Sequence, residues 1–198
     1  MEQWKKDRSV RITASRFGDV LARPSSKRYR YYMEDLIESL QGHKKVPKTT
    51  PWFDHGREME AEAVLFYEWR MDREVEKFGC DNPKSFVHPK YDHISCSPDI
   101  RDGSNGAEFK CHTSYTEFEK ARISGIPSKA KPQVQGTLWI MGCKWWNYVS
   151  YYRNGEKRLI HIYPVYPDLE YHEMLEEKCL DFWGKIQSKI KTQKRDSE

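Results

Sequence analysis

The hydrophobic periodicity of this chain changes near Gly79, and this change restricts the fold more than any other feature. Before it, apolar residues recur at the three- and four-residue spacing of amphipathic helices, most clearly over residues 29–40. After it, glycines and prolines separate short segments rich in the β-branched and aromatic residues typical of strands. The chain therefore combines helices with a sheet and is neither all-α nor all-β.

The same patterns predict the individual elements. We expect helices over 13–21, 29–40, 52–69, 113–123, 131–141 and 168–189, and strands over 86–88, 93–96, 107–111, 145–152 and 158–165. Asn154-Gly155 predicts a hairpin turn between the last two strands. The predicted fold class is α/β, with one small mixed sheet flanked by helices. A length of 198 residues fits one domain over 1–190, followed by a polar tail over 191–198.

Composition excludes a membrane-spanning protein. Charged residues make up 32% of the chain, and no apolar run approaches the roughly 20 residues that cross a bilayer. The N-terminus has no apolar core of a signal peptide, so we expect an intracellular protein. A formal net charge of +4 permits binding to nucleic acid without proving it.

Cysteine and histidine usage argues against structural cross-links. The five cysteines are scattered and include no Cys-x-x-Cys pair, so we expect packed, reduced thiols: Cys80, Cys96, Cys111, Cys143 and Cys179. The seven histidines have no spacing typical of a zinc site, so we predict packed or exposed histidines.

The most informative stretch is Ser97-Pro98-Asp99 followed by Glu108-Phe109-Lys110. If 93–99 and 107–111 are the arms of a hairpin, Glu108 and Lys110 share one face and Asp99 lies opposite them. Two carboxylates and the Phe109 carbonyl then form an all-oxygen nest that suits Mg²⁺ or Mn²⁺, and the lysine can orient a water. This indicates a phosphodiester hydrolase. A solvated hairpin with a cross-strand ion pair is the alternative.

Further residues could belong to such a site. Glu60 shares a helical stripe with Val64 and Tyr67, where a carboxylate requires a compensating cation; a half-exposed glutamate is the alternative. Arg8 with the hydroxyls of 12–15 at a helix start resembles a phosphate cradle, and an ordinary N-cap is the alternative. In 131–136, Gln133 could project its amide toward the metal face.

Taken together, these motifs resemble the YqaJ-type viral recombinase or lambda exonuclease family of the PD-(D/E)xK nuclease superfamily. They appear in the family's order and run from residue 8 to about 152: Arg8…Ile12-Thr13-Ala14-Ser15, Gly56-x-x-x-Glu60, Ser97-Pro98-Asp99, Glu108-Phe109-Lys110-Cys111 and Gln133-Val134-Gln135…Leu138-Trp139. Five ordered motifs are stronger evidence than any one of them. The resemblance implies a restriction-endonuclease-like core.

The resemblance also implies a role for each matching residue. Asp99, Glu108 and the Phe109 carbonyl would hold the catalytic Mg²⁺, for which Mn²⁺ can substitute, with Glu60 as a further acidic ligand. Lys110 would position the attacking water, and Gln133 would support the scissile phosphate or that water.

Two further roles concern the DNA itself. Arg8 and Ser15 match the pocket for the terminal 5′-phosphate, and Arg122 resembles a basic residue near the DNA backbone. Two positions depart from the family pattern. Ile100 replaces the glycine that usually follows Ser-Pro-Asp, and Ala130 replaces a tyrosine three residues before Gln133.

The resulting functional hypothesis is a Mg²⁺-dependent 5′-to-3′ exonuclease that degrades one strand of double-stranded DNA for single-strand annealing recombination. By resemblance, its partners would be a single-strand annealing protein and further copies in a homotrimer, in the cytoplasm of a bacterial host if the chain is phage-derived. Two alternatives remain open. One is an endonuclease of the same superfamily, and the other is a catalytically silent DNA-binding module.

Overall fold

The computed structural model describes residues 2–43, 51–79 and 82–195, without the side chains of 2, 3 and 51–57. It contains two sheets. The smaller has the order β1 (Ile12–Thr13), β4 (Ile94–Cys96) and β3 (Phe86–Val87). The larger has the order β2 (Glu76–Lys77), β5 (Ile100–Asp102), β6 (Asn105–His112), β7 (Trp146–Asn154) and β8 (Lys157–Val165).

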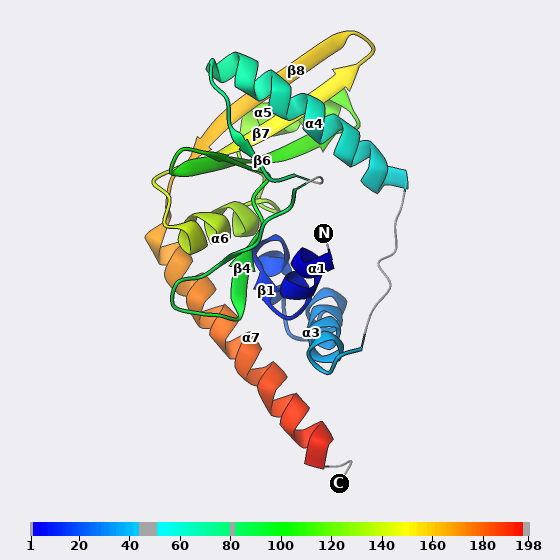
Figure 1. Ribbon diagram of the computed structural model, residues 1–198, viewed down its shortest axis with the longest axis vertical. Coiled ribbons are helices and arrows are strands. Elements are labelled where there is room, and N and C mark those ends of the chain that lie inside the picture. The colour runs from blue at the N-terminus through cyan, green and yellow to red at the C-terminus, as the bar shows by residue number, and fades with distance from the viewer. Residues whose placement is uncertain (1, 44–50, 80–81, 196–198) are drawn as a thin grey trace.

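Helices flank both sheets, so the α/β class is confirmed, although two sheets replace the single sheet that we expected (Figure 1). The first helices are α1 (Glu2–Ser9), α2 (Phe17–Val20) and α3 (Lys27–Leu40), with a 3₁₀ turn, η1 (Ala14–Arg16), before α2. The remaining helices are α4 (Pro51–Met71), α5 (Tyr115–Ser124), α6 (Lys131–Met141) and α7 (Leu169–Arg195). The helix expected over 13–21 is therefore the short η1 and α2 pair.

The hairpin that carries the acidic motif differs from the predicted one. β4 belongs to the smaller sheet, and the strand antiparallel to β6 is β5, in which Ile100 pairs with Ala107. Pro98 explains the change. It lies between β4 and β5, and because a proline has no N–H to donate to a partner strand, the two segments do not form one continuous strand. The second predicted hairpin is confirmed. β7 and β8 pair antiparallel, and Gly155 at their turn has φ +58°.

The larger sheet is covered on both faces. On one face, Ala63, Val64 and Tyr67 of α4 pack against Phe109 and Val149. On the other face, apolar residues of α6 pack against the larger sheet and its ends: Val134 and Leu138 against Trp146, Tyr148 and Val165. The aromatic run of β7 therefore serves mainly the core, as the alternation of strand positions predicted.

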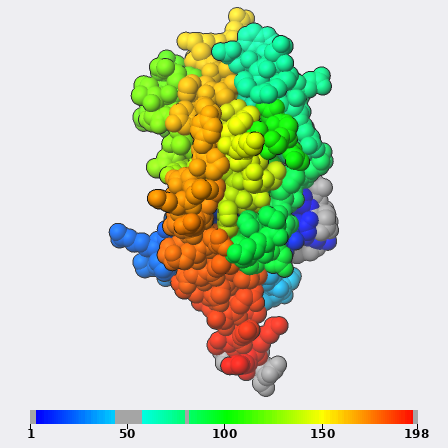
Figure 2. Space-filling model, turned by 90° about the vertical axis from the view of Figure 1, so that its left-hand side faces the viewer, coloured from blue at the N-terminus to red at the C-terminus, as the bar shows by residue number. Residues whose placement is uncertain are grey.

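A second core joins α2, α3 and α7 to the smaller sheet. α7 runs to Arg195, past residue 190 where we expected a tail to begin. The last turns of α7 contact this core and the end of α3. Ile190 packs against the core, and the amide of Gln41, which caps α3, donates to Gln193 Oε1 at 2.8 Å. Figure 2 shows α7 forming the tapered end of the molecule. Residues 196–198 lie outside the described part.

The described cysteines fit the predicted packed thiols. Cys96, Cys143 and Cys179 are buried, Cys111 is half-buried, and all four are free. Burial raises the pKa of each thiol, which keeps it protonated. Cys80 lies outside the described residues. Of the helices in the described ranges, none has both the length and the apolar character required to span a membrane.

Candidate active site

Asp99 and Glu108 meet at the edge where β5 begins. Asp99 directly precedes β5 and Glu108 lies on β6, so continuing the register beyond the Ile100 and Ala107 pair brings the two acids face to face. The Phe109 N–H donates to Asp99 Oδ2 at 2.7 Å. Because the N–H and C=O of one strand residue point to the same side, this bond indicates that the Phe109 carbonyl also faces Asp99.

The amine of Lys110 and the side-chain amide of Gln133 converge on the Glu108 carboxylate. Lys110 Nζ donates to Glu108 Oε1 at 2.8 Å, which confirms that residues 108 and 110 share a face. Gln133 Nε2, from the first turn of α6, donates to the same oxygen at 2.6 Å. The Glu108 side chain is only 5% exposed, whereas that of Lys110 is 43% exposed. The structure thus buries the acid and leaves the amine accessible to a ligand.

Glu60 lies beside Asp99 on the α4 side. A Cβ placed on Gly79 would be 3.0 Å from Glu60 Oε1, and the Gly79 N–H donates to the Asp99 carbonyl at 3.1 Å. Burial, followed by the charges of Glu108 and Glu60, raises the pKa of Asp99 well above its ordinary value. Gly56, which belongs to the same sequence motif as Glu60, lies among the residues whose side-chain surroundings are outside the description.

The donor chemistry of this cluster suits a hard divalent cation. Mg²⁺ is usually held by one or two carboxylates, together with waters and substrate phosphate. Asp99, Glu108 and the Phe109 carbonyl supply such a set, and their mutual repulsion is what a cation would relieve. Among the described residues, no three His, Cys, Asp or Glu side chains form a group that could hold a metal ion. The charge of Glu60 acts on Asp99, and its role as a further metal ligand stays a prediction.

Arg8 and Ser15 come together as the sequence predicted. Arg8 Nη2 donates to Ser15 Oγ at 2.8 Å, and Thr13 Oγ1 lies 3.3 Å from the same hydroxyl. Burial lowers the pKa of Arg8, while the nearby charges of Tyr32, Glu108 and Asp99 raise it. The arginine is therefore near the acidic cluster as well as the hydroxyls.

Arg122 is not brought into this cluster. It lies on α5 and forms an ion pair with Glu119 on the same helix, with Nη2 2.8 Å from Oε2. The other charged or titratable groups that act on it are Tyr115 and His161. Its predicted contact with the DNA backbone thus concerns a surface separate from Asp99 and Glu108.

Sequence reasoning missed two neighbours of the cluster, Tyr148 and Trp4. Tyr148 is buried opposite Glu108 on β7, and burial raises its pKa to about 12. Trp4 Nε1 donates to Ser97 Oγ at 3.1 Å. Only Trp4 had a usable signal, because it precedes Arg8 by four residues and so shares its helix face. The parallel pairing of β6 with β7, which brings Tyr148 into place, is not readable from local sequence.

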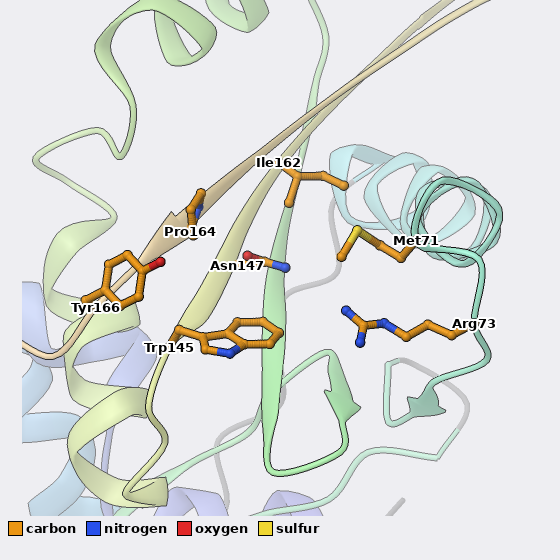
Figure 3. A pocket seen from close by; sticks show the side chains of 7 residues that line it. All are labelled: Met71, Arg73, Trp145, Asn147, Ile162, Pro164 and Tyr166. Carbon is orange, nitrogen blue, oxygen red and sulfur yellow. The ribbon is translucent and has the colours of Figure 1, made fainter.

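A separate hollow of about 300 Å³ lies at the C-terminal end of α4. Figure 3 shows Arg73 approaching it from beyond Met71, with Trp145 and Asn147 on the side of the sheet. Arg73 pairs with Asp102 at 3.0 Å, and Asn147 donates to Tyr67, which in turn donates to Asp102. None of the predicted site residues lines this hollow, so it is distinct from the acidic cluster.

The sequence of this protein matches a known family, and its fold matches solved structures. The model of the YqaJ-like viral recombinase domain matches residues 3–144. No curated relative matches the sequence. Three solved structures share the fold across nearly the whole of both chains.

The crystal structure of LHK-Exo in complex with dAMP has a TM-score of 0.86 and 24% identity, covering 100% of this chain and 98% of that one. The alkaline exonuclease LHK-Exo from Laribacter hongkongensis has a TM-score of 0.82 and 24% identity, with the same coverage of 100% and 98%. A phage related exonuclease from Haemophilus somnus 129PT has a TM-score of 0.66 and 12% identity, covering 96% and 97%. The domain match extends over more than half of the 198 residues, and the protein therefore belongs to the YqaJ-like viral recombinase domain family.

Proposed function

We propose that this protein is a divalent-metal-dependent nuclease that degrades one strand of double-stranded DNA from its 5′ end. The observation that carries the proposal is the convergence of four polar side chains on β6. Lys110 and Gln133 both donate to Glu108, and Asp99 accepts from the N–H of the next residue, Phe109. Family membership and likeness in fold to exonucleases support a hydrolase that cleaves phosphodiesters.

Asp99, Glu108 and the Phe109 carbonyl would hold the metal, with Glu60 as a further acidic ligand. Bound Mg²⁺, or Mn²⁺ in its place, would supply a Lewis acid that lowers the pKa of water and stabilises negative charge on the reacting phosphate. Burial and the nearby charges of Glu108 and Glu60 raise the pKa of Asp99, and a cation bound there would relieve this repulsion.

The remaining side chains orient the reactants. Lys110 has an accessible amine beside Glu108 and would donate to the attacking water. Gln133, held against Glu108 by its amide N–H, would support the scissile phosphate or the same water. The direction of attack is in line with the departing 3′-oxygen, as phosphodiester hydrolysis requires.

Arg8 and Ser15 would bind the terminal 5′-phosphate. The Ser15 hydroxyl lies 2.8 Å from the Arg8 guanidinium and 3.3 Å from the Thr13 hydroxyl, and these groups offer a charge and several donors to a phosphate. This pocket lies close enough to Asp99 and Glu108 for their charges to act on Arg8. Arg122 would contact the DNA backbone on the outer face of α5 instead.

The biological setting belongs to the same proposal. Strand degradation from 5′ ends exposes single strands for an annealing protein, which would be the partner in recombination. A homotrimer would hold the DNA during repeated cleavage. The DNA substrate places the activity inside a cell, in the cytoplasm of a bacterial host if the chain is phage-derived.

A time course on duplex DNA tests the reaction and its end requirement. Linear duplexes with a 5′-phosphate or a 5′-hydroxyl, each labelled on one strand, are incubated with and without Mg²⁺ beside a closed circle. We expect Mg²⁺-dependent release of nucleotides from the phosphorylated 5′ end and an intact circle. Efficient cutting of the circle would instead identify an endonuclease. No digestion with Mg²⁺ or Mn²⁺ would identify a silent DNA-binding module.

A further inference from the structure

Trp4 lies between the two parts of the proposed site. Its ring faces the Arg8 guanidinium, whose Cζ is 5.0 Å from the ring centroid. Its Nε1–H donates to Ser97 Oγ at 3.1 Å. Ser97 precedes Asp99 by two residues, and the intervening Pro98 is buried. One side chain thus contacts both the arginine proposed for the 5′-phosphate and the loop that carries a proposed metal ligand.

Arg8 needs such a support because two sets of groups interact with its guanidinium, the Ser15 hydroxyl and the carboxylates of the acidic cluster. Its Nη2 donates to Ser15 Oγ, where the 5′-phosphate would bind. The negative charges of Glu108 and Asp99 also attract it. A long, flexible arginine drawn onto those acids would leave the phosphate pocket and occupy oxygens needed by the metal. Stacking on a tryptophan ring restricts the guanidinium plane and opposes that movement.

We propose that Trp4 is a positioning residue that holds Arg8 for the terminal 5′-phosphate and fixes the pocket relative to Asp99. This inference rests on the proposed function and adds a determinant of end specificity to it. The ring holds the guanidinium, and the Nε1–H bond to Ser97 ties α1 to the loop before β5. α1 therefore takes part in distinguishing a phosphorylated end from a hydroxyl end.

Two substitutions separate these contacts. Trp4→Phe keeps a ring beneath Arg8 and removes the N–H bond, whereas Trp4→Leu removes both. Ser97→Ala removes the bond from the other side and should match Trp4→Phe. Trp69→Leu is the matched control, because Trp69 is 71% exposed on α4 and contacts Phe66 rather than the cluster.

The readout is the ratio of kcat/KM for 5′-phosphate ends to that for 5′-hydroxyl ends. We expect Trp4→Leu to lower this ratio by about 3- to 30-fold, mainly through KM for the phosphorylated end. Trp4→Phe and Ser97→Ala should lower this ratio by only about 2- to 10-fold, because both variants keep an aromatic ring at position 4 and lose only the hydrogen bond. Trp69→Leu should leave it within about twofold.

Binding without metal gives a second readout. In EDTA, the dissociation constants of 5′-phosphorylated and 5′-hydroxyl duplexes are compared by fluorescence anisotropy. Trp4→Leu should raise the dissociation constant of the 5′-phosphorylated duplex and leave that of the 5′-hydroxyl duplex unchanged. In an Arg8→Ala background it should cause no further loss, because Trp4 acts through Arg8.

The outcomes separate this inference from the function beneath it. If Trp4→Leu keeps the wild-type preference, or slows both substrates equally, Trp4 is structural and the inference is wrong. If it does not fold, as judged by its thermal midpoint, the paired Trp4→Phe and Ser97→Ala results decide in the same way. A wild type that digests both ends equally would overturn end recognition by Arg8 and the inference with it. A wild type without metal-dependent digestion would overturn the nuclease itself.

Discussion

Among single residues, Glu108 links the proposed catalytic groups. Its Oε1 accepts from both Lys110 and Gln133, and its charge helps to raise the pKa of Asp99. A buried carboxylate without such donors would be strongly unfavourable. The amine and the amide therefore make it possible for this acid to lie within the fold while remaining ready for a cation.

Gln133→Ala should reduce activity and also lower stability, because the buried Glu108 carboxylate loses a donor. The variant removes a donor from a charged acceptor, an interaction of about 1.5–3 kcal/mol, so we expect kcat to fall about 10- to 150-fold. Steady-state rates on the phosphorylated duplex measure the loss. Gln41→Ala, on an exposed glutamine that bonds Gln193, should change kcat less than about twofold. Equal rates for wild type and Gln133→Ala would remove Gln133 from the proposed machinery.

At this scale the sequence predicted the polar cluster but not its surroundings. Glu108 and Lys110 alternate along one strand, so their shared face follows from local geometry. The Arg8 contact with Ser15 follows from a spacing within one short segment. Tyr148 reaches the site through the pairing of β6 with β7, and Trp4 contacts Ser97 across a long separation in sequence. No local pattern in the sequence encodes either contact.

Among the elements, the contact between α6 and η1–α2 brings the two halves of the site together. Gly136 of α6 faces Phe17, and a Cβ there would be 2.3 Å from the ring. Gln133 lies one turn earlier on α6, and Ser15 lies in η1 just before Phe17. The absence of a side chain at Gly136 thus sets the distance between the proposed catalytic and phosphate-binding groups.

Gly136→Ala should therefore disturb both stability and end preference. Overpacking against Phe17 is expected to lower the free energy of unfolding by about 1–3 kcal/mol, and the shift of η1 should reduce the preference for 5′-phosphate ends. Urea unfolding and the paired-end assay measure the two effects. Gly184→Ala is the control, since Gly184 also lies in a helix but has open space around it, and it should gain about 0.5–1 kcal/mol. Similar stability of the two variants would contradict the close contact.

A second contact fixes α6 against α7. The Gln135 amide donates to the Tyr166 carbonyl at 2.9 Å, and its Oε1 lies 2.8 Å from His172 Nε2 and accepts from the Asp168 N–H. Burial lowers the pKa of His172, although the Asp168 charge acts in the opposite direction. His172 therefore stays neutral in the folded protein at pH values where it would be protonated in the unfolded chain.

This contact predicts a loss of stability in mild acid. Below the unfolded pKa of about 6.5 the unfolded chain binds more protons, so stability falls as pH decreases toward the lower folded value, by at most about 1.4 kcal/mol per pH unit for one histidine. Burial also lowers the pKa of His88, His112 and His161, so these residues add to the loss of stability in acid. His172→Gln should be less stable than wild type at pH 8, and the difference should narrow by pH 5.5. A difference that does not vary with pH would show that His172 does not contribute.

The sequence predicted the long helices, β6, β7 and β8 of the larger sheet, and the short strands β3 and β4. It did not predict β1, β2 or β5, nor the division into two sheets. Residues 29–40 and 131–141 show periodicity over several turns, and the structure has α3 and α6 there. β1, β2 and β5 are only two or three residues long, too short to show any period. The smaller sheet also depends on a parallel contact between Ile12 and Ile94 that tertiary packing decides.

Across the whole molecule, the proposed site lies where two cores meet. One core joins α4 to the larger sheet, and the other joins α2, α3 and α7 to the smaller sheet. Asp99 lies on the connection between β4 of the smaller sheet and β5 of the larger sheet. The net charge of +4 is too small to explain DNA binding by itself, so we expect local groups such as Arg8 to provide it.

The central claim is that Asp99 and Glu108 hold a divalent cation that cleaves DNA, and Asp99→Asn tests it most directly. The measurement is kcat with Mg²⁺ on the phosphorylated duplex, beside the thermal midpoint and the dissociation constant for that duplex in EDTA. We expect kcat to fall at least about 10³-fold, because the metal supplies several kcal/mol to the transition state. The midpoint should not decrease, since the variant removes repulsion with Glu108 and Glu60, and the dissociation constant should stay within about threefold. Cleavage by Asp99→Asn at the wild-type rate would contradict the account.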